Sequence, residues 1–148
     1  MLRKVISGGQ TGADFGFIHA AKHLLGLETG GWLPKGCCTD EGTKRWMLAE
    51  YGMQEHPSWQ YPPRTEANVR EADGTCIVGN VDSPGCSLTV RLCKRHGKPY
   101  IVNPSPAELR QWVEANHIEV LNGAGNRERT NPGIFSRTVE LMVAAFKG

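Results

Sequence analysis

The chain has 148 residues, about the size of one domain, and its 39% hydrophobic and 22% charged residues are typical of a globular protein. The net charge of +2 is too small to indicate a nucleic-acid partner, which usually requires a strongly basic face. No apolar run approaches the roughly 20 residues that cross a bilayer, and no signal peptide is recognisable. We therefore expect a cytoplasmic protein with a single domain over residues 1–148.

The chain begins with a pattern of strand, glycine-rich loop and helix. Residues 4–7 are strand-like, residues 13–25 show helical spacing of apolar positions, and Gly26 follows as a C-terminal cap. Free N–H groups at the start of this helix would face the loop SGGQTGAD (residues 7–14), which favours an anion there. A tight turn that only packs the helix on the sheet is the alternative. Without a P-loop ending or the G-x-G-x-x-G spacing, ATPase and NAD-binding interpretations are weakened.

The next segment gives mixed signals. We predict a short strand within 29–34, a loop over 37–43 and one or two helical turns within 44–51. Several prolines then favour an extended, partly exposed connection over 53–63. Trp32, which lies in this region, could stack on a ring system, although tryptophans more often anchor loops.

A second strand, loop and helix follow. We predict a helix over 64–72, a buried strand over 75–78 and a helix over about 87–95. In the loop DSPGCSLT (residues 82–89), Gly85 allows close approach to a ligand, and Ser87 and Thr89 are available at a helix start. If this loop and the loop over residues 7–14 follow neighbouring strands of the sheet, the two loops would form one cleft. An ordinary capped turn is the alternative.

The last third of the chain contains a third glycine-rich segment. We predict a strand over 99–102, a helix capped by Ser105, a strand over 118–121, a glycine loop over 122–128 and a final helix after Gly133. Strands that alternate with helices predict an α/β fold, with a mainly parallel sheet and helices on both faces. Ligands of such sheets lie outside the carboxyl ends of the strands.

Two arginines are candidates for phosphate recognition. Arg64 lies with Thr65, Glu66 and Asn68 in a short helix, and Arg127 precedes Glu128 in the third glycine segment. A salt-bridged surface is the alternative for both sets. We interpret all five cysteines as reduced thiols. His19 and His23 have no obvious third metal ligand, and the adjacent Cys37 and Cys38 fit a structural pair better than a reactive or metal-binding site, so we expect no metal site.

Several strings, in order along nearly the whole chain, closely resemble the molybdenum-cofactor carrier family. They are ISGGQTGAD (6–14), GGWLPKG (30–36), YPPRTEANV (61–69), DGTCIV (73–78), the loop around Gly85 and Thr89, GKP (97–99) and LNGAGNRE (121–128) followed by PGI (132–134). This family is a circularly permuted branch of the SLOG superfamily, which also contains the Lonely Guy phosphoribohydrolases.

The resemblance implies a Rossmann-like three-layer fold, a homo-oligomer (dimer or tetramer) and a site for molybdenum cofactor (molybdopterin) or a related nucleotide-like, phosphorylated ligand. Together with Asp14 and Trp32, the binding residues would be Gly8, Gly9, Gln10, Thr11, Gly12, Arg64, Thr65, Asn68, Gly85, Ser87, Thr89, Asn122, Gly125 and Arg127. Where the family usually has Gly-Gly-Thr, this chain has Gly85-Cys86-Ser87. The catalytic glutamate of the Lonely Guy motif has no counterpart after Thr89, which disfavours phosphoribohydrolase activity.

We therefore expect a carrier that binds its ligand without turnover and has no catalytic residues. One alternative is an enzyme that hydrolyses or transfers a group from a nucleotide derivative, with Asp14, Glu66 or Glu128 as the acid–base residue. A protein-interaction module, whose glycine loops are only structural, is the other alternative.

Overall fold

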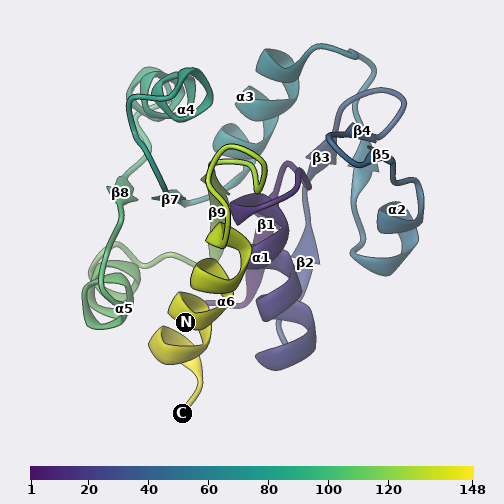
Figure 1. Cartoon of the computed structure of the whole chain (residues 1–148). Helices are drawn as coiled ribbons and strands as arrows, with labels where there is room; N and C mark the ends of the chain where they lie inside the picture. The colour runs from purple at the N-terminus through teal and green to yellow at the C-terminus, as the bar shows by residue number, and fades with distance from the viewer.

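The computed structural model describes residues 1–148, and a five-stranded parallel sheet forms its centre (Figure 1). The strand order is β2-β1-β9-β7-β8, and every neighbouring pair is parallel. The strands are β1 (Lys4–Ser7), β2 (Glu28–Gly30), β7 (Gly74–Val78), β8 (Tyr100–Val102) and β9 (Val120–Gly125). The predicted loops after β1 and β7 are therefore not on neighbouring strands, because β9 lies between them.

Helices cover both faces of the sheet, so the predicted three-layer Rossmann-like fold is confirmed. Contacts between helices group α1 (Ala13–His19), α5 (Pro106–Ala115) and α6 (Ile134–Phe146) on one face, and α3 (Tyr61–Glu71) and α4 (Pro84–Arg95) on the other. Helix α1 continues as a π-helical segment, η1 (Ala20–Leu24), and Gly26 follows with a φ of 67°. The longest helix has 13 residues, and none has the length and apolar character of a membrane span.

The segment between β2 and α3 contains four short strands and a short helix. Strands β3 (Trp32–Leu33) and β6 (Gln54–Glu55) pair in parallel, and β4 (Cys38–Thr39) and β5 (Gly42–Thr43) form an antiparallel hairpin. Helix α2 (Trp46–Glu50) follows the hairpin. The prediction of a loop over 37–43 was thus wrong, since Thr39 Oγ1 donates to Gly42 O at 2.8 Å and closes the turn.

Two helices start earlier than the sequence predicted. Helix α3 begins at Tyr61, because Pro62 and Pro63 lie in its first turn, where a helix needs no N–H donor. Helix α4 likewise begins at Pro84, so that Gly85 and Ser87 belong to its first turn rather than to a loop.

Residues 122–125 of the predicted third glycine loop instead belong to β9, the central strand of the sheet, and only residues 126–128 lie outside it. A Cβ atom on Gly123 would lie 2.1 Å from Cγ of Phe17, and one on Gly125 would lie 2.0 Å from the carbonyl oxygen of Val78. These glycines are therefore needed where α1 and β7 approach the β9 backbone closely. The fully buried side chains of Phe17, Leu121 and Ile134 belong to the main core on this face.

Candidate functional site: a polar cavity at the carboxyl ends of the strands

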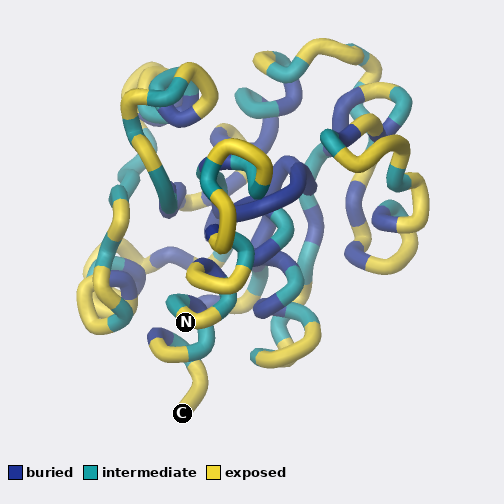
Figure 2. The backbone as a smooth tube through the Cα atoms, in the orientation of Figure 1, coloured by how far each residue is buried: buried dark blue, intermediate teal, exposed yellow.

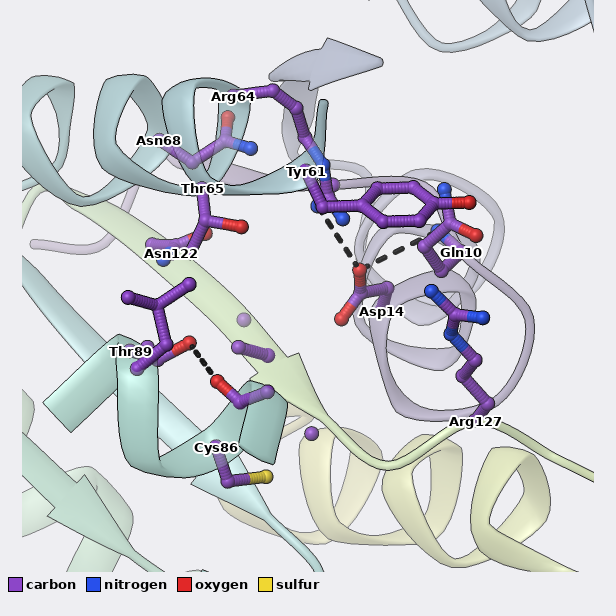
Figure 3. Close-up of a pocket in the computed structure, with 16 residues that line it drawn as sticks. Gln10, Asp14, Tyr61, Arg64, Thr65, Asn68, Cys86, Thr89, Asn122 and Arg127 are labelled. Carbon is purple, nitrogen blue, oxygen red and sulfur yellow. Dashed lines mark hydrogen bonds and ion pairs between the residues drawn. The ribbon is translucent and has the colours of Figure 1, made fainter. Parts of the chain in front are cut away.

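A cavity of about 270 Å³ opens at the carboxyl ends of β1, β9 and β7 (Figure 3). The end of β9 lines its floor, three residues of the β1–α1 segment and the start of α4 line two sides, and α3 lies across it. The lining residues are Gly8, Gln10, Asp14, Tyr61, Arg64, Thr65, Asn68, Gly85, Cys86, Leu88, Thr89, Asn122, Gly123, Ala124, Gly125 and Arg127. This is the position at which parallel α/β sheets bind their ligands.

Arg64 is a buried cation with no hydrogen bond from its side chain. The residue is 7% exposed, its Nε atom has no partner, and Nη1 lies 3.8 Å from Oδ2 of Asp14. The guanidinium lies directly over Gly8, where a Cβ atom would be only 1.5 Å from Nη1. Burial lowers the pKa of Arg64, because the charged form has lost its hydration. The cavity thus holds a desolvated positive charge with free donors.

Asp14 is the acidic partner in the same cavity. Burial raises the pKa of Asp14 to about 6, although Arg64 and the N–H of Gln10 both favour the charged carboxylate. The Gln10 N–H donates to Oδ2 at 3.4 Å, which is long for a charge-assisted bond. Asp14 therefore compensates the charge of Arg64 only in part.

The start of α4 supplies further donors to the cavity. The first N–H groups of a helix have no acceptor inside the helix, and in α4 these belong to Gly85 and Cys86, which line the cavity. The N-cap residue Ser83 makes no side-chain capping bond to them. Thr89, one turn further on, donates from Oγ1 to Gly85 O at 3.0 Å. This helix end favours an anion through both its free donors and its dipole.

The start of α1, in contrast, is covered by its own chain. Residues 5–14 are buried without interruption (Figure 2). The Ala13 N–H donates to Asn126 O at 3.1 Å, and a Cβ atom on Gly12 would lie 2.5 Å from both Asn126 O and Glu128 N. Gly9, Thr11 and Gly12 accordingly do not line the cavity. Of the first loop, only Gly8, Gln10 and Asp14 reach it.

Trp32 and Ser87 are likewise not among the lining residues. Trp32 Nε1 donates to the Glu71 carboxylate, its backbone N–H donates to Asn68 Oδ1 at 2.9 Å, and its ring meets His56 edge-on. Trp32 thus anchors the β3 segment to α3. The other predicted residues come together: Gly8, Gln10, Asp14, Arg64, Thr65, Asn68, Gly85, Thr89, Asn122, Gly125 and Arg127 all line the cavity.

Tyr61 is the most informative lining residue that the sequence prediction missed. The guanidinium carbons of Arg64 and Arg127 lie 5.1 Å and 4.9 Å from the centre of its ring. Tyr61 precedes Arg64 by three residues and shares its helix face, so an earlier helix start would have identified it. Cys86, Leu88, Gly123 and Ala124 were also missed; nothing in their residue types indicates a ligand.

Of the three carboxylates considered as acid–base groups, only Asp14 lines the cavity. Glu66 accepts a hydrogen bond from His96 at 2.8 Å on the surface, and this bond lowers its pKa. Glu128 accepts from the N–H groups of Gly133 at 2.6 Å and Phe135 at 3.0 Å, which lowers its pKa. Glu66 and Glu128 therefore have structural partners, and Glu128 caps the start of α6.

No group of three His, Cys, Asp or Glu side chains is arranged to hold a metal ion. His19 and His23 lie side by side at 5.1 Å between ring centres, and all five cysteines are free.

A larger groove of about 650 Å³ lies at the opposite edge of the sheet, between the two ends of the chain and α5, and is lined mostly by hydrophobic residues. It lacks the convergent buried polar groups of the cavity at the carboxyl ends.

Comparisons with known proteins agree with this architecture. The crystal structure of a protein from Syntrophus aciditrophicus, described as a "Putative molybdenum carrier protein", superimposes with a TM-score of 0.87 and 33% sequence identity. The alignment covers 99% of this chain and 96% of that one. No curated protein matches the chain. The model of the circularly permutated YpsA SLOG family matches residues 5–146. The chain therefore belongs to the circularly permutated YpsA SLOG family.

Proposed function

We propose that the protein binds a small phosphorylated ligand in the cavity and carries it without chemical change. The observation that carries this proposal is the Arg64 side chain, which is buried, charged and without a hydrogen bond. A buried charge that lacks hydrogen bonds and is only partly compensated by an ion pair is costly, and proteins rarely keep one without a functional reason. A phosphate group would offer it two parallel acceptors.

The start of α4 supports the same ligand class. The donors of Gly85 and Cys86 and the positive end of the α4 dipole favour the negative charge that Arg64 also attracts. A cavity of about 270 Å³ is close to the lower limit of roughly 300–1,000 Å³ for small-molecule sites, which favours one phosphorylated ring compound over a dinucleotide.

Molybdenum cofactor, or a related nucleotide-like molecule, is the ligand that we propose. The description of the Syntrophus protein as a molybdenum carrier and the shared family support this choice. Arg64 and the start of α4 fit the phosphate of such a molecule. Since the cavity brings no set of metal-ligating side chains together, a metal would be held by donor atoms of the ligand itself. A homo-oligomer remains a further proposal, which rests on the family resemblance.

A second candidate function is that of an enzyme acting on a nucleotide derivative, and Asp14 is the one residue that favours it. A carboxyl group with a pKa of about 6 exchanges protons near neutral pH, as a general acid or base must. This candidate predicts turnover of the bound molecule, whereas the carrier function predicts that the molecule is recovered intact.

The test combines native mass spectrometry with calorimetric titration of AMP, inorganic phosphate and molybdate. We expect AMP and phosphate to bind and Arg64→Ala to weaken their binding at least tenfold. Arg70→Ala is the matched control: Arg70 is an exposed residue of the same helix and does not line the cavity. The proposal would be refuted if wild type and Arg64→Ala bound the compounds equally well. It would also be refuted if neither AMP nor phosphate bound to the wild type. Released product after incubation would favour the enzyme.

A further inference from the structure

Arg127 differs from Arg64 in that its guanidinium donates a hydrogen bond to a carboxylate, whereas Arg64 lies near the carboxylate of Asp14 without bonding to it. Arg127 lines the cavity two residues after the end of β9, and its Nη1 donates to Oδ1 of Asp40 at 2.7 Å. Asp40 is in the turn between β4 and β5, far from Arg127 in the sequence. A second bond, from Gln10 Nε2 to Cys38 O at 3.2 Å, attaches the same hairpin to the cavity wall.

The Asp40–Arg127 pair is shielded from solvent on the side of the carboxylate. The Asp40 side chain is 12% exposed, and its Oδ2 atom is buried without a partner. Arg129 also approaches Asp40, but only at 3.8 Å and with a side chain that is 77% exposed. Because shielded charge pairs are screened less than surface pairs, Asp40 holds Arg127 firmly.

The two arginines face the same ring but are in different electrostatic states. Their guanidinium groups lie 5.1 Å and 4.9 Å from the centre of Tyr61, which Figure 3 shows between them. Arg64 has free donors, whereas the charge of Arg127 is neutralised by Asp40. The cavity therefore presents one available cation and a second one that is held by the hairpin.

We propose that Asp40 is a specificity-determining residue, which limits the cavity to ligands with a single phosphoryl group by holding Arg127. A second phosphoryl group would need Arg127 as its counter-charge and would have to compete with Asp40 for it. This inference rests on the proposed function, because it concerns the charge of the ligand that Arg64 binds. It assigns to the β4–β5 hairpin a role in recognition, although Asp40 does not line the cavity.

The test is a calorimetric comparison of inorganic phosphate and pyrophosphate as probes. We expect Asp40→Asn to increase the affinity for pyrophosphate about tenfold and that for phosphate less than threefold, since only the longer anion reaches the released Arg127. Glu41→Gln is the matched control. It removes one negative charge from the same hairpin, but its carboxylate pairs with Lys44 at the surface, so both affinities should stay unchanged.

A double-mutant cycle separates the release of Arg127 from the mere loss of a negative charge. In the Asp40→Asn background, Arg127→Ala should abolish the gain in pyrophosphate affinity, and in the wild-type background it should lower that affinity less than threefold. A gain that persists without Arg127 would overturn the inference, as would equal gains for both probes. Should Asp40→Asn fail to fold, a tenfold loss caused by Arg127→Ala alone would also overturn it, because Arg127 would then already serve the ligand.

The outcomes also distinguish this inference from the proposed function. If Arg64→Ala abolishes the binding of phosphate while Asp40→Asn changes neither affinity, the cavity binds anions but Asp40 does not select among them. If Arg64→Ala leaves both affinities unchanged, the proposed function fails, and the inference fails with it.

Discussion

The Arg64 guanidinium and the Asp14 carboxylate face each other in the cavity at 3.8 Å, from Nη1 to Oδ2, without a hydrogen bond. Each group has lost its water, and neither is fully compensated by the other. Burial accordingly raises the pKa of Asp14 and lowers that of Arg64, so that each charge is disfavoured. A third charged group that enters the cavity will therefore shift the pKa values of Asp14 and Arg64.

The first prediction concerns stability and pH. The folded-state pKa of Asp14, about 6, lies above its ordinary value of 3.8, so its stabilising contribution is complete below pH 4 and is lost as the pH rises through 6. This rise of about two pKa units corresponds to a contribution to the free energy of unfolding on the order of 3 kcal/mol. Urea denaturation between pH 4 and 8 should show wild type losing stability relative to Asp14→Asn. Parallel curves for the two proteins would contradict this.

The second prediction concerns anion binding and pH. A bound anion next to Arg64 should raise the pKa of Asp14 further, because two negative charges then share one cation. Sulfate, which does not titrate between pH 5 and 8, should therefore bind more tightly below pH 6 and take up a proton on binding. Calorimetry in buffers with different ionisation enthalpies measures this uptake. In Asp14→Asn the uptake should disappear; if it remains, another group is responsible.

The third prediction concerns the start of α6. Glu128→Ala removes the acceptor for the N–H groups of Gly133 and Phe135 and should lower the free energy of unfolding by about 1–2 kcal/mol at pH 7. Because these bonds lower the pKa of Glu128, their contribution is present above its ordinary pKa of 4.5 and is lost as the pH falls through the lowered value. Glu140→Ala, at an exposed position of the same helix, should change stability little. Equal effects of the two changes in chemical denaturation would refute the role of Glu128.

The fourth prediction tests the close approach of α1 to β9. Gly123→Ala would place a Cβ atom 2.1 Å from Cγ of the fully buried Phe17, so we expect a loss of about 3 kcal/mol or failure to fold. Gly85→Ala is the control for stability, because no atom lies within 4 Å of its added Cβ. Thermal unfolding of both variants should show a large effect at Gly123 only.

The fifth prediction compares two buried threonines. Thr138 is fully buried and its hydroxyl has no partner, so Thr138→Val should raise the free energy of unfolding by about 1 kcal/mol. The hydroxyl of Thr75, which is equally buried, accepts a hydrogen bond from Asn122 Nδ2 at 3.3 Å. Thr75→Val should therefore lower stability by about the same amount. Urea titrations that give both changes the same sign would contradict this account.

The sequence predicted those parts of the fold that depend on local signals. The strand, loop and helix units at β1–α1 and β7–α4 have clear apolar patterns. The predicted cap of α5 is present as a capping box, in which Ser105 Oγ accepts from the Glu108 N–H and the Glu108 carboxylate accepts from the Ser105 N–H. Strand β9 was predicted to end at residue 121, because its glycines resemble a loop until the positions of Phe17 and Val78 are known.

The same distinction between local and distant signals applies to the site. Arg64, Thr65 and Asn68 were predicted from a short polar stretch that forms one helix, and all three line the cavity. The exclusion of Gly12 depends on Asn126 and Glu128, which are more than 100 residues away and cover it. The pairing of Arg127 with Asp40 spans 87 positions and has no signal in the sequence.

Because β9 is the central strand, both the sheet and the cavity depend on a segment near the end of the sequence. Before residue 120 is synthesised, β1 and β7 have no strand between them, and each half of the sheet exposes an unpaired edge. The cavity floor, at Asn122–Gly125, is added after more than four fifths of the chain. A chain that ends before β9 therefore lacks both the floor of the cavity and a continuous sheet.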